Sequence, residues 1–329
     1  MNVEDVMRCS FSAWYDKFED VTVHSTILPI PHEFLDYLNA DGVFLPEGSH
    51  QGAYSSAAPE DSEDEEKVDW STEDESACSR IMPECSDFLA QIDAAIQHLG
   101  GRVFPKLNWS SPQDASWVSL NNSLMCSRAS DICLLLKSSD FITYDLTQPF
   151  SKCGDCEVAQ RDVVLKPELV LRKWCDINTS SEFRCFVRAG CLVAISQRNH
   201  SKFFKHIMES KQEITEDIED FFAEIIDGNF SEQEDCSYTF DVWRKRKGQV
   251  VLVDFNPFGP VTDSLLCVES EEGIQPHALA HFGVPTDFVD LASGEDPFKF
   301  RDFLQLGVGS NWCLVLGICK SGHGTLYLT

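Results

Sequence analysis

Several features are missing from this sequence, and each absence narrows its function. No stretch of the 329 residues is long and apolar enough to span a membrane, and no signal-peptide pattern opens the chain. Positive charge is scarce, since 26 Lys and Arg stand against 54 Asp and Glu, for a net charge of −28. Proteins that bind along nucleic acid need a basic surface. We therefore expect a cytoplasmic protein with no membrane or direct nucleic-acid partner.

The signatures of several common sites are also absent. The chain has no Walker-type glycine pattern for a nucleotide. Cys153 and Cys156 have zinc-knuckle spacing, but neither a second such pair nor paired histidines accompany them, which favours an ordinary loop. Most of the 14 cysteines fall in apolar runs, as Cys133 and Cys185 do. This placement predicts reduced, buried thiols rather than disulfides.

An acidic segment separates two regions of ordinary composition. Residues 50–79 include the run Glu-Asp-Ser-Glu-Asp-Glu-Glu at 60–66. Such a segment buries little apolar surface and repels itself, which predicts a disordered linker. Ser62, Ser71 and Ser76 lie among acids, as the substrates of acidophilic kinases do, although any acidic linker that contains serine would share this pattern.

The stretch at 249–259, Gln-Val-Val-Leu-Val-Asp-Phe-Asn-Pro-Phe-Gly, is the most informative in the chain. Its first half is β-branched and apolar, which predicts a buried strand. Residues 237–244 predict a second strand, and Lys247 and Gly248 between the two have the composition of a tight hairpin turn.

A two-residue turn at this point would place Asp241 directly opposite Asp254, with Asn256 on the same face. Two carboxylates that face each other across a sheet repel unless a cation lies between them. Asp241, Asp254 and Asn256 offer only oxygen ligands, the set that Mg²⁺ prefers. The spacing therefore predicts a magnesium site, and the alternative is that these residues simply end strands in solvent.

Other cationic residues are candidates for contacts with an anion. Lys106 leaves an apolar strand beside a loop of small residues, as a phosphate-binding lysine would. Arg184 and Arg198 lie on the strands of a second predicted hairpin. Spacing alone fits equally well a role in binding an anion and a role in surface salt bridges.

Six segments, in the same order, resemble the cell division cycle protein 123 family. The resemblance covers roughly residues 1–306. The matching segments are Phe11-Ser-Ala-Trp-Tyr15, Val103-Phe-Pro-Lys-Leu-Asn-Trp-Ser110, Lys137-Ser-Ser-Asp-Phe-Ile142, Leu169-Val-Leu-Arg-Lys-Trp-Cys175, Glu182-Phe-Arg-Cys-Phe-Val187, and Val253-Asp-Phe-Asn-Pro-Phe-Gly259 with Thr262-Asp-Ser264. The acidic linker resembles an acidic insertion in that family.

The resemblance implies an α+β, ATP-grasp-like fold, in which two lobes with antiparallel sheets hold ATP between them. The expected organisation is an N-terminal segment packed on the body (1–49), the linker (50–79), a smaller lobe (80–170), a larger lobe with the Mg²⁺ site (171–306) and a tail (307–329). The tail is more apolar than the polar tail usual in the family, and residues after 266 diverge until about 284.

The resemblance also assigns roles to residues. Lys106 would contact the phosphates, the loop at 108–114 would fold over them, and Arg184 would lie near them. The main chain of Trp174 and Cys175 would read the adenine. The implied ATP-binding set is Lys106, Asn108, Trp109, Ser111, Gln113, Asp114, Arg172, Lys173, Trp174, Cys175, Glu182, Arg184, Asp241, Asp254 and Asn256, the last three also holding Mg²⁺.

The family implies a function in protein assembly. Its members act as ATP-binding assembly chaperones that bind the gamma subunit of the heterotrimeric translation initiation factor two, in support of translation initiation and cell division. The alternative is an ATP-grasp carboxylate ligase or a phosphotransferase. No nucleophile and general base occur together at a recognisable spacing, which favours the binding role over the enzymatic one.

Overall fold

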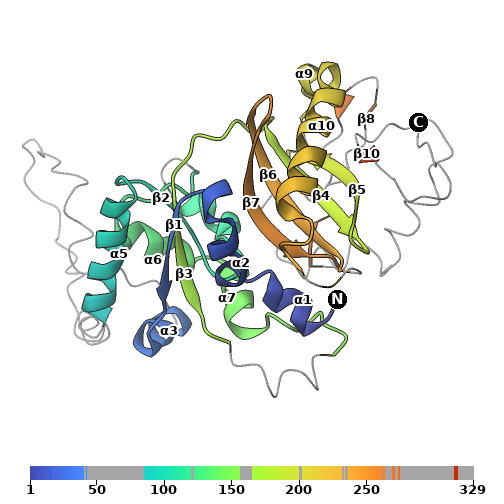
Figure 1. Cartoon of the computed structure of the whole chain (residues 1–329). Coiled ribbons are helices and arrows are strands. Elements are labelled where there is room, and N and C mark those ends of the chain that lie inside the picture. The colour runs from blue at the N-terminus through green and yellow to red at the C-terminus, as the bar shows by residue number, and fades with distance from the viewer. Residues whose placement is uncertain are drawn as a thin grey trace, which may run out of the picture. The chain divides into compact units, whose positions relative to one another are not determined.

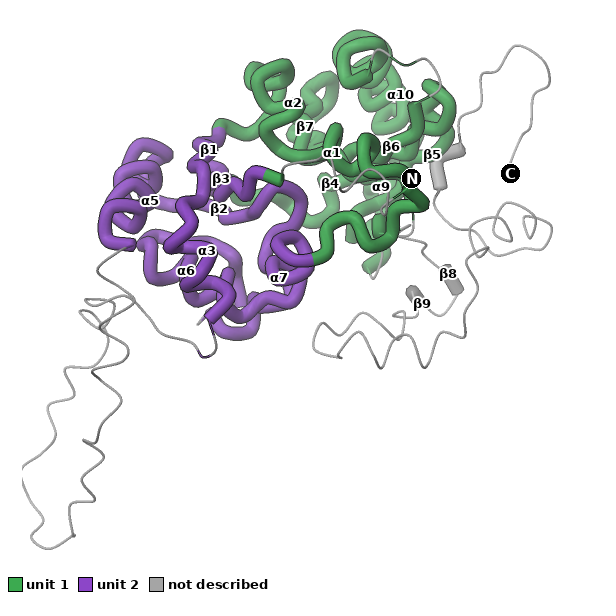
Figure 2. The backbone as a smooth tube through the Cα atoms, turned by 90° about the horizontal axis from the view of Figure 1, so that it is seen from below, with its two compact units in different colours: residues 1–24, 148–165, 175–329 green, residues 25–147, 166–174 purple. Residues whose placement is uncertain are grey.

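The computed structural model describes residues 1–40, 42, 85–119, 122–155, 165–199, 202–231, 233, 236–259 and 261–263, together with the short strands at 269–270, 273–274 and 315–317. These residues form helices and antiparallel sheets, so the predicted α+β class is confirmed. The predicted linker, at 50–79, and the apolar tail at 307–329 except for residues 315–317 lie outside the described residues. The chain divides into two compact units, coloured separately in Figure 2.

Unit 2 comprises residues 25–147 and 166–174 and is built on a three-stranded sheet of order β1-β3-β2. Both strand pairs are antiparallel, and Leu171 of the central strand lies between Thr26 and Pro105. The elements of this unit are β1 (Ser25–Pro29), α3 (His32–Asn39), α5 (Ser86–His98), β2 (Val103–Lys106), η3 (Gln113–Val118), α6 (Ala129–Lys137), α7 (Asp140–Thr147) and β3 (Glu168–Lys173).

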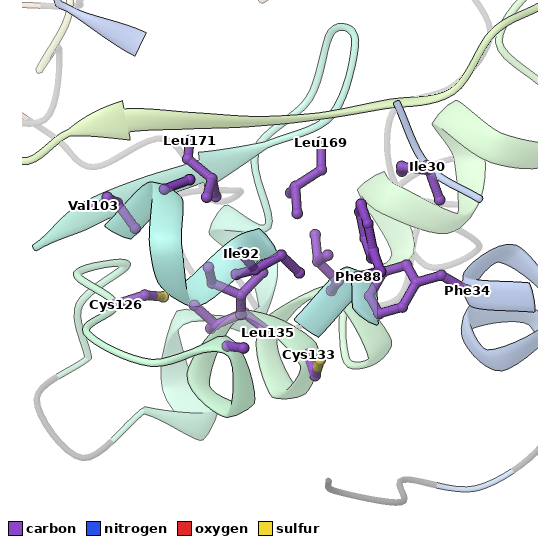
Figure 3. Close-up of a cluster of buried hydrophobic side chains, with 14 of the residues drawn as sticks. Ile30, Phe34, Phe88, Ile92, Val103, Cys126, Cys133, Leu135, Leu169 and Leu171 are labelled. Atoms are coloured by element: carbon purple, nitrogen blue, oxygen red, sulfur yellow. The ribbon is translucent and has the colours of Figure 1, made fainter. Parts of the chain in front are cut away.

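Helices α5 and α6 supply much of the core of unit 2. Ile92 and Ile132 are fully buried, as helical spacing of apolar residues predicts. The sheet adds Leu169 and Leu171 to the same cluster, which Figure 3 shows in close-up. Gly100 and Gly101 have φ of +96° and +82°, values that favour glycine, and they end α5 where the sequence predicts its end.

Unit 1 comprises residues 1–24, 148–165 and 175–329. Its five-stranded antiparallel sheet has the order β10-β5-β4-β6-β7. Its elements are α1 (Val3–Arg8), α2 (Phe11–Phe18), η1 (Glu19–Val21), β4 (Glu182–Arg188), β5 (Cys191–Gln197), α9 (Lys205–Glu209), α10 (Lys211–Phe221), η4 (Phe222–Ile226), β6 (Tyr238–Arg246), β7 (Gln249–Pro257), β8 (Glu269–Ser270), β9 (Gly273–Ile274) and β10 (Val315–Gly317).

One face of the unit 1 sheet is covered by aromatic and helical side chains. Phe240 and Phe255 lie opposite each other on β6 and β7, and Phe222 stacks on Phe240 at a centroid distance of 6.0 Å. Trp14 of α2 packs edge-on against Phe255 at 5.3 Å. Figure 1 shows α10 lying along the strands. Because side chains alternate along a strand, the neighbours of Phe240 and Phe255 point to the other face.

The unit boundaries differ from those predicted. Strand β1 lies in the segment assigned to the N-terminal region, yet it pairs with β3 and belongs to unit 2, while residues 1–24 belong to unit 1. The boundary near 170 moves to 174, because β3 is the central strand of its sheet and cannot be divided. Among the described residues, no helix has the length and apolar character needed to cross a lipid bilayer.

Candidate functional site

The β6–β7 hairpin has the predicted geometry at its functional end. Asp241 pairs with Asp254, and Asn256 pairs with Thr239 two residues along the ladder. Gly248 takes a φ of +66° in the predicted turn. Asp254 and Asn256 are two residues apart on β7, so they share the face opposite the aromatic core. The structure therefore brings all three predicted metal ligands together.

Two irregularities in this hairpin were not predicted from the sequence. The register shifts between Asp241 and Val242, and again between Arg244 and Arg246. The first shift places one extra residue on β7, and the second places one extra residue on β6. The two shifts cancel, so Asp241 still pairs with Asp254. A bulge of this kind turns the strand locally and can redirect side chains beside a site.

Strand β4 adds a cation to the same row of side chains. Arg184 is paired with Asp241 across the β4–β6 ladder. Its Nε donates to Asp241 Oδ1 at 2.8 Å, and its Nη2 donates to Oδ2 at 2.8 Å. Only 5% of the Arg184 side chain and 11% of the Asp241 side chain are exposed. This is a buried, bidentate ion pair, the strongest form of the carboxylate–guanidinium contact.

The ion pair sets the pKa of the arginine. Burial alone would lower the pKa of Arg184, but the Asp241 carboxylate and its hydrogen bonds outweigh burial, so the pKa lies above its ordinary value. Arg184 Nη1 also donates to the main-chain oxygen of Asp263 at 2.9 Å. Arg184 thus forms a salt bridge, as one of the two alternatives predicted, but the pair is buried and does not lie on the surface.

Arg198 and Glu182 extend the network. Arg198 Nε lies 3.7 Å from Asp241 Oδ2, so both arginines of the second hairpin are directed at one carboxylate. Burial raises the pKa of Glu182, and Arg198 opposes this effect. A partly buried carboxylate with a raised pKa beside a cluster of charges is a common feature of functional sites.

The donor set fits a magnesium ion. Among the described residues, no group of three His, Cys, Asp or Glu side chains could hold a metal by itself, so a third ligand must be of another type. Asn256 supplies an amide oxygen beside the two carboxylates. A carboxylate has about four acceptor positions, and Arg184 engages one on each oxygen of Asp241. The bidentate contact with Arg184 fixes the orientation of the Asp241 carboxylate.

Unit 2 contains the remaining candidate residues. Lys106, at the end of β2, is only 2% exposed. Charged side chains are rarely buried to this degree without a structural or functional reason. Arg172 of β3 is 5% exposed, whereas Lys173 is exposed at the end of the strand. Burial thus singles out Lys106 and Arg172 from the other basic residues of this sheet.

The main-chain roles predicted near the end of β3 are partly taken by protein contacts. Trp174 N donates to Arg102 O at 3.0 Å, so this N–H is used within the sheet rather than offered to a base. The main-chain oxygen of Cys175 accepts from Ile177 N at 2.9 Å. These bonds use one main-chain group of each residue, the N–H of Trp174 and the oxygen of Cys175. That the main chain of Trp174 and Cys175 reads adenine stays a prediction.

The loop after Lys106 is held by contacts that the sequence did not predict. Asn108 is 5% exposed, and its side chain donates to Lys166 O at 3.0 Å and accepts from Glu168 N at 3.0 Å. Its amide therefore ties the loop to the start of β3. That the loop folds over phosphates stays a prediction. The partly buried residues Trp109, Ser111 and Gln113 lie along the same loop.

Helix α7 holds the two halves of this loop. Ser110 donates to Asp145 through both its N–H, at 2.7 Å, and its Oγ, at 2.8 Å. Asp114 accepts from Asp140 N at 2.7 Å and from Phe141 N at 3.3 Å, so it caps the N-terminus of the helix. Asp114 was predicted to lie over phosphates, but the structure assigns its carboxylate to this cap.

Asp145 is the functional candidate that sequence reasoning missed. It is 4% exposed, and burial raises its pKa to about 6 despite the opposing hydrogen bonds from Ser110 and the charge of Lys106. The only sequence signal is its helical spacing from Ile142, which places a carboxylate on the buried face of a short helix.

The raised pKa leads to a pH-dependent difference between wild type and the Asp145→Asn variant. Asp145 has a pKa of about 6 in the folded protein against an ordinary value of 3.8, so between these values the folded protein binds more protons than the unfolded chain. Its contribution to the free energy of unfolding therefore falls as pH rises through this window. We expect Asp145→Asn to gain stability relative to wild type from about pH 4 to pH 7, by up to roughly 3 kcal/mol.

Urea unfolding of both proteins across this pH range measures that difference. Every other titrating group is shared, so its contribution cancels in the comparison. Identical pH dependence in the two proteins would contradict a buried, ionised Asp145.

Comparison with known sequences shows which proteins this chain resembles. Residues 14–291 match the D123 family. A *Xenopus tropicalis* protein named "Translation initiation factor eIF2 assembly protein" is 42% identical over 332 residues, covering 93% of this chain and 97% of its own length. "Cell division cycle protein 123" of *Yarrowia lipolytica* is 41% identical and covers 80% of this chain and 66% of its own length.

A solved structure supports the same relationship. C-terminally truncated Cdc123 from *Schizosaccharomyces pombe* superposes with a TM-score of 0.64 at 32% sequence identity. The match covers 80% of this chain and 89% of that protein. The similarity thus extends over both units and includes most of the described residues.

Proposed function

Because the chain belongs to the D123 family, which the sequence motifs predicted under the name cell division cycle protein 123, we propose that it is an assembly factor for heterotrimeric translation initiation factor two. The observation that carries this proposal is the 42% identity to a protein named for that activity, over 93% of this chain. Under this proposal the protein acts in the cytoplasm, in translation initiation and cell division.

The proposal includes a specific partner, the gamma subunit of the factor. A chain with 54 acidic and 26 basic residues favours a partner that contributes basic side chains. Association would then weaken as the salt concentration rises, because surface charges are screened.

The proposal also includes ATP and Mg²⁺ in an ATP-grasp-like fold. Two separate units, each with an antiparallel sheet, agree with such a fold. Asp241, Asp254 and Asn256 would hold the metal, which would neutralise charge on the phosphates of the nucleotide. That ATP lies between two lobes stays a prediction.

Under this proposal each unit would supply some of the contacts to the nucleotide. Lys106 and Arg172 would bind the phosphates or the base from unit 2, and Arg184 would act from unit 1 while it holds Asp241. Burial of all three arginine and lysine side chains means that each charge is already oriented by the fold. Binding of ATP would then cost little side-chain conformational entropy, because these side chains are already ordered in the free protein.

ATP would act as a structural ligand in this proposal. A bound nucleotide can favour one arrangement of the protein only by binding it more tightly than the others. If that arrangement is also the one that holds the gamma subunit, each ligand raises the affinity of the other by the same factor. An ATP-grasp ligase or a phosphotransferase would instead turn ATP over on a small acceptor.

Calorimetry and a turnover assay together test this function. We expect ATP to bind with Mg²⁺ and much more weakly with EDTA, and the gamma subunit to tighten ATP binding. Product formation should be slow with the protein alone. Rapid multiple turnover on a small acceptor in the absence of the gamma subunit would overturn the assembly role in favour of the ligase.

A further inference from the structure

Helix α7 holds the Lys106 loop at two points, and one of these contacts is buried. Asp145, near the C-terminal end of the helix, accepts two hydrogen bonds from Ser110. At the other end, Asp114 receives the first N–H groups of the helix. Residues 110 and 114 are thus fixed to one short, rigid element.

The chemistry of Asp145 is unusual for a purely structural contact. A buried carboxylate costs free energy unless it is hydrogen-bonded or paired, and its pKa of about 6 reports that cost. A neutral side chain of the same shape would make the Ser110 contacts without burying a charge. The charge does have one further effect, because it interacts with the buried ammonium group of Lys106.

Lys106 and Ser110 are four positions apart, at the two sides of the turn that follows β2. Leu107 N donates to Ser110 O at 2.8 Å and closes this turn. Asp145 therefore acts on both sides of one tight turn, through hydrogen bonds on one side and through charge on the other. Removing it would release Ser110 and change the field at Lys106 together.

We propose that Asp145 is a positioning residue for nucleotide phosphates. It acts through its hydrogen bonds to Ser110, which hold the turn that bears Lys106, without touching the ligand. This inference rests on the proposed function, in which Lys106 binds the phosphates of ATP. Without the Asp145–Ser110 contact the turn would adopt several conformations. ATP would bind only those protein molecules in which the turn has the conformation that places Lys106 against the phosphates. The affinity for ATP would fall more than the affinity for AMP, because AMP lacks the outer phosphates.

The test compares Asp145→Ala, Asp145→Asn and Ser110→Ala in the full chain. The asparagine can accept from Ser110 N and donate to Ser110 Oγ, so it keeps both contacts. We expect Asp145→Ala to weaken ATP binding roughly tenfold, the equivalent of losing one hydrogen bond to a charged group. Asp145→Asn should stay within a few-fold of wild type, and Ser110→Ala should fall between the two.

A matched control comes from the same unit. Asp93 on α5 accepts from Ala129 N at 2.8 Å, so Asp93→Ala also removes a carboxylate that holds a main-chain N–H. It should leave ATP affinity unchanged. Hydrogen exchange at the Ser110 amide gives a readout of the turn that needs no nucleotide, and it should speed up in Asp145→Ala but not in Asp93→Ala.

Each outcome bears on the proposal. Faster exchange with a lower ratio of ATP to AMP affinity in Asp145→Ala, restored by asparagine, supports it. Faster exchange with unchanged ATP affinity overturns it, as does unchanged exchange. If the alanine variant does not fold, Ser110→Ala and Asp145→Asn carry the same comparison. Wild-type protein that binds no ATP overturns the proposed function itself, and this is seen before any variant is made.

Discussion

Replacing Asp254 with alanine should abolish Mg²⁺-dependent ATP binding while leaving the fold intact. Asp254 faces Asp241 across the hairpin, so the change removes one charge from a repulsive pair and one of the three predicted metal ligands. We expect affinity for ATP with Mg²⁺ to fall by at least about 100-fold, because loss of a group that only supports a metal ligand already costs about 10- to 100-fold.

Calorimetric titration of ATP with and without Mg²⁺ measures this effect. Asp254→Asn is the matched control, because it keeps an oxygen ligand but loses the charge, and it should bind with intermediate affinity. Thermal unfolding without ligand shows whether the fold is preserved. Unchanged ATP affinity in a folded Asp254→Ala protein would remove Asp254 from the metal site.

Replacing Asp241 with alanine should lower the free energy of unfolding more than replacing Asp254 does. Its partner Arg184 is 95% buried and would be left with only part of its hydrogen-bonding environment. Breaking a buried ion pair by removing one partner costs about 3 to 5 kcal/mol of unfolding free energy. Asp254→Ala should cost much less, so loss of ATP binding in Asp241→Ala would not by itself identify a ligand.

A double-mutant cycle with Arg184→Met isolates the pair. Each single variant leaves one buried charge behind, whereas the double variant leaves neither, so the double loss should be smaller than the sum of the single losses. Urea unfolding of the four proteins gives the coupling free energy. Strictly additive losses would mean that the Asp241–Arg184 contact is not the buried ion pair described above.

The sequence predicted the half of the candidate site that depends on local geometry. The turn at Lys247 and Gly248 predicts that Asp241 pairs with Asp254, and the observed pairing agrees with that prediction because the two register shifts between them cancel. Periodicity likewise predicted α5 and its glycine stop. The two compensating bulges could not be predicted, because they depend on how both strands pack in the finished sheet.

The other half depends on contacts between distant segments. Ser110 and Asp145 are 35 residues apart, and Asn108 meets Glu168 after 60 residues. No turn type or periodicity relates such positions. The sequence therefore could not predict that Asn108, which was assigned to ligand binding, holds the loop to the start of β3. The same limit explains why β1 was separated from the sheet that it joins.

The buried Arg184 shows where sequence and structure complement each other. Spacing on β4 left open whether Arg184 binds an anion or forms a salt bridge. The structure pairs it with a predicted metal ligand, and that pairing allows it to orient Asp241 in the absence of any ligand. A preset carboxylate of this kind favours tight metal binding because its geometry is already fixed.

The measurement that most directly tests the account is assembly of the heterotrimeric initiation factor from its separate subunits, with wild-type protein and with Asp254→Ala. We predict that wild type increases the yield of the complex when ATP and Mg²⁺ are present, and that the variant, folded but without its metal site, does not. Assembly by Asp254→Ala at the wild-type level, with ATP binding lost, would contradict the claim that the nucleotide site serves assembly.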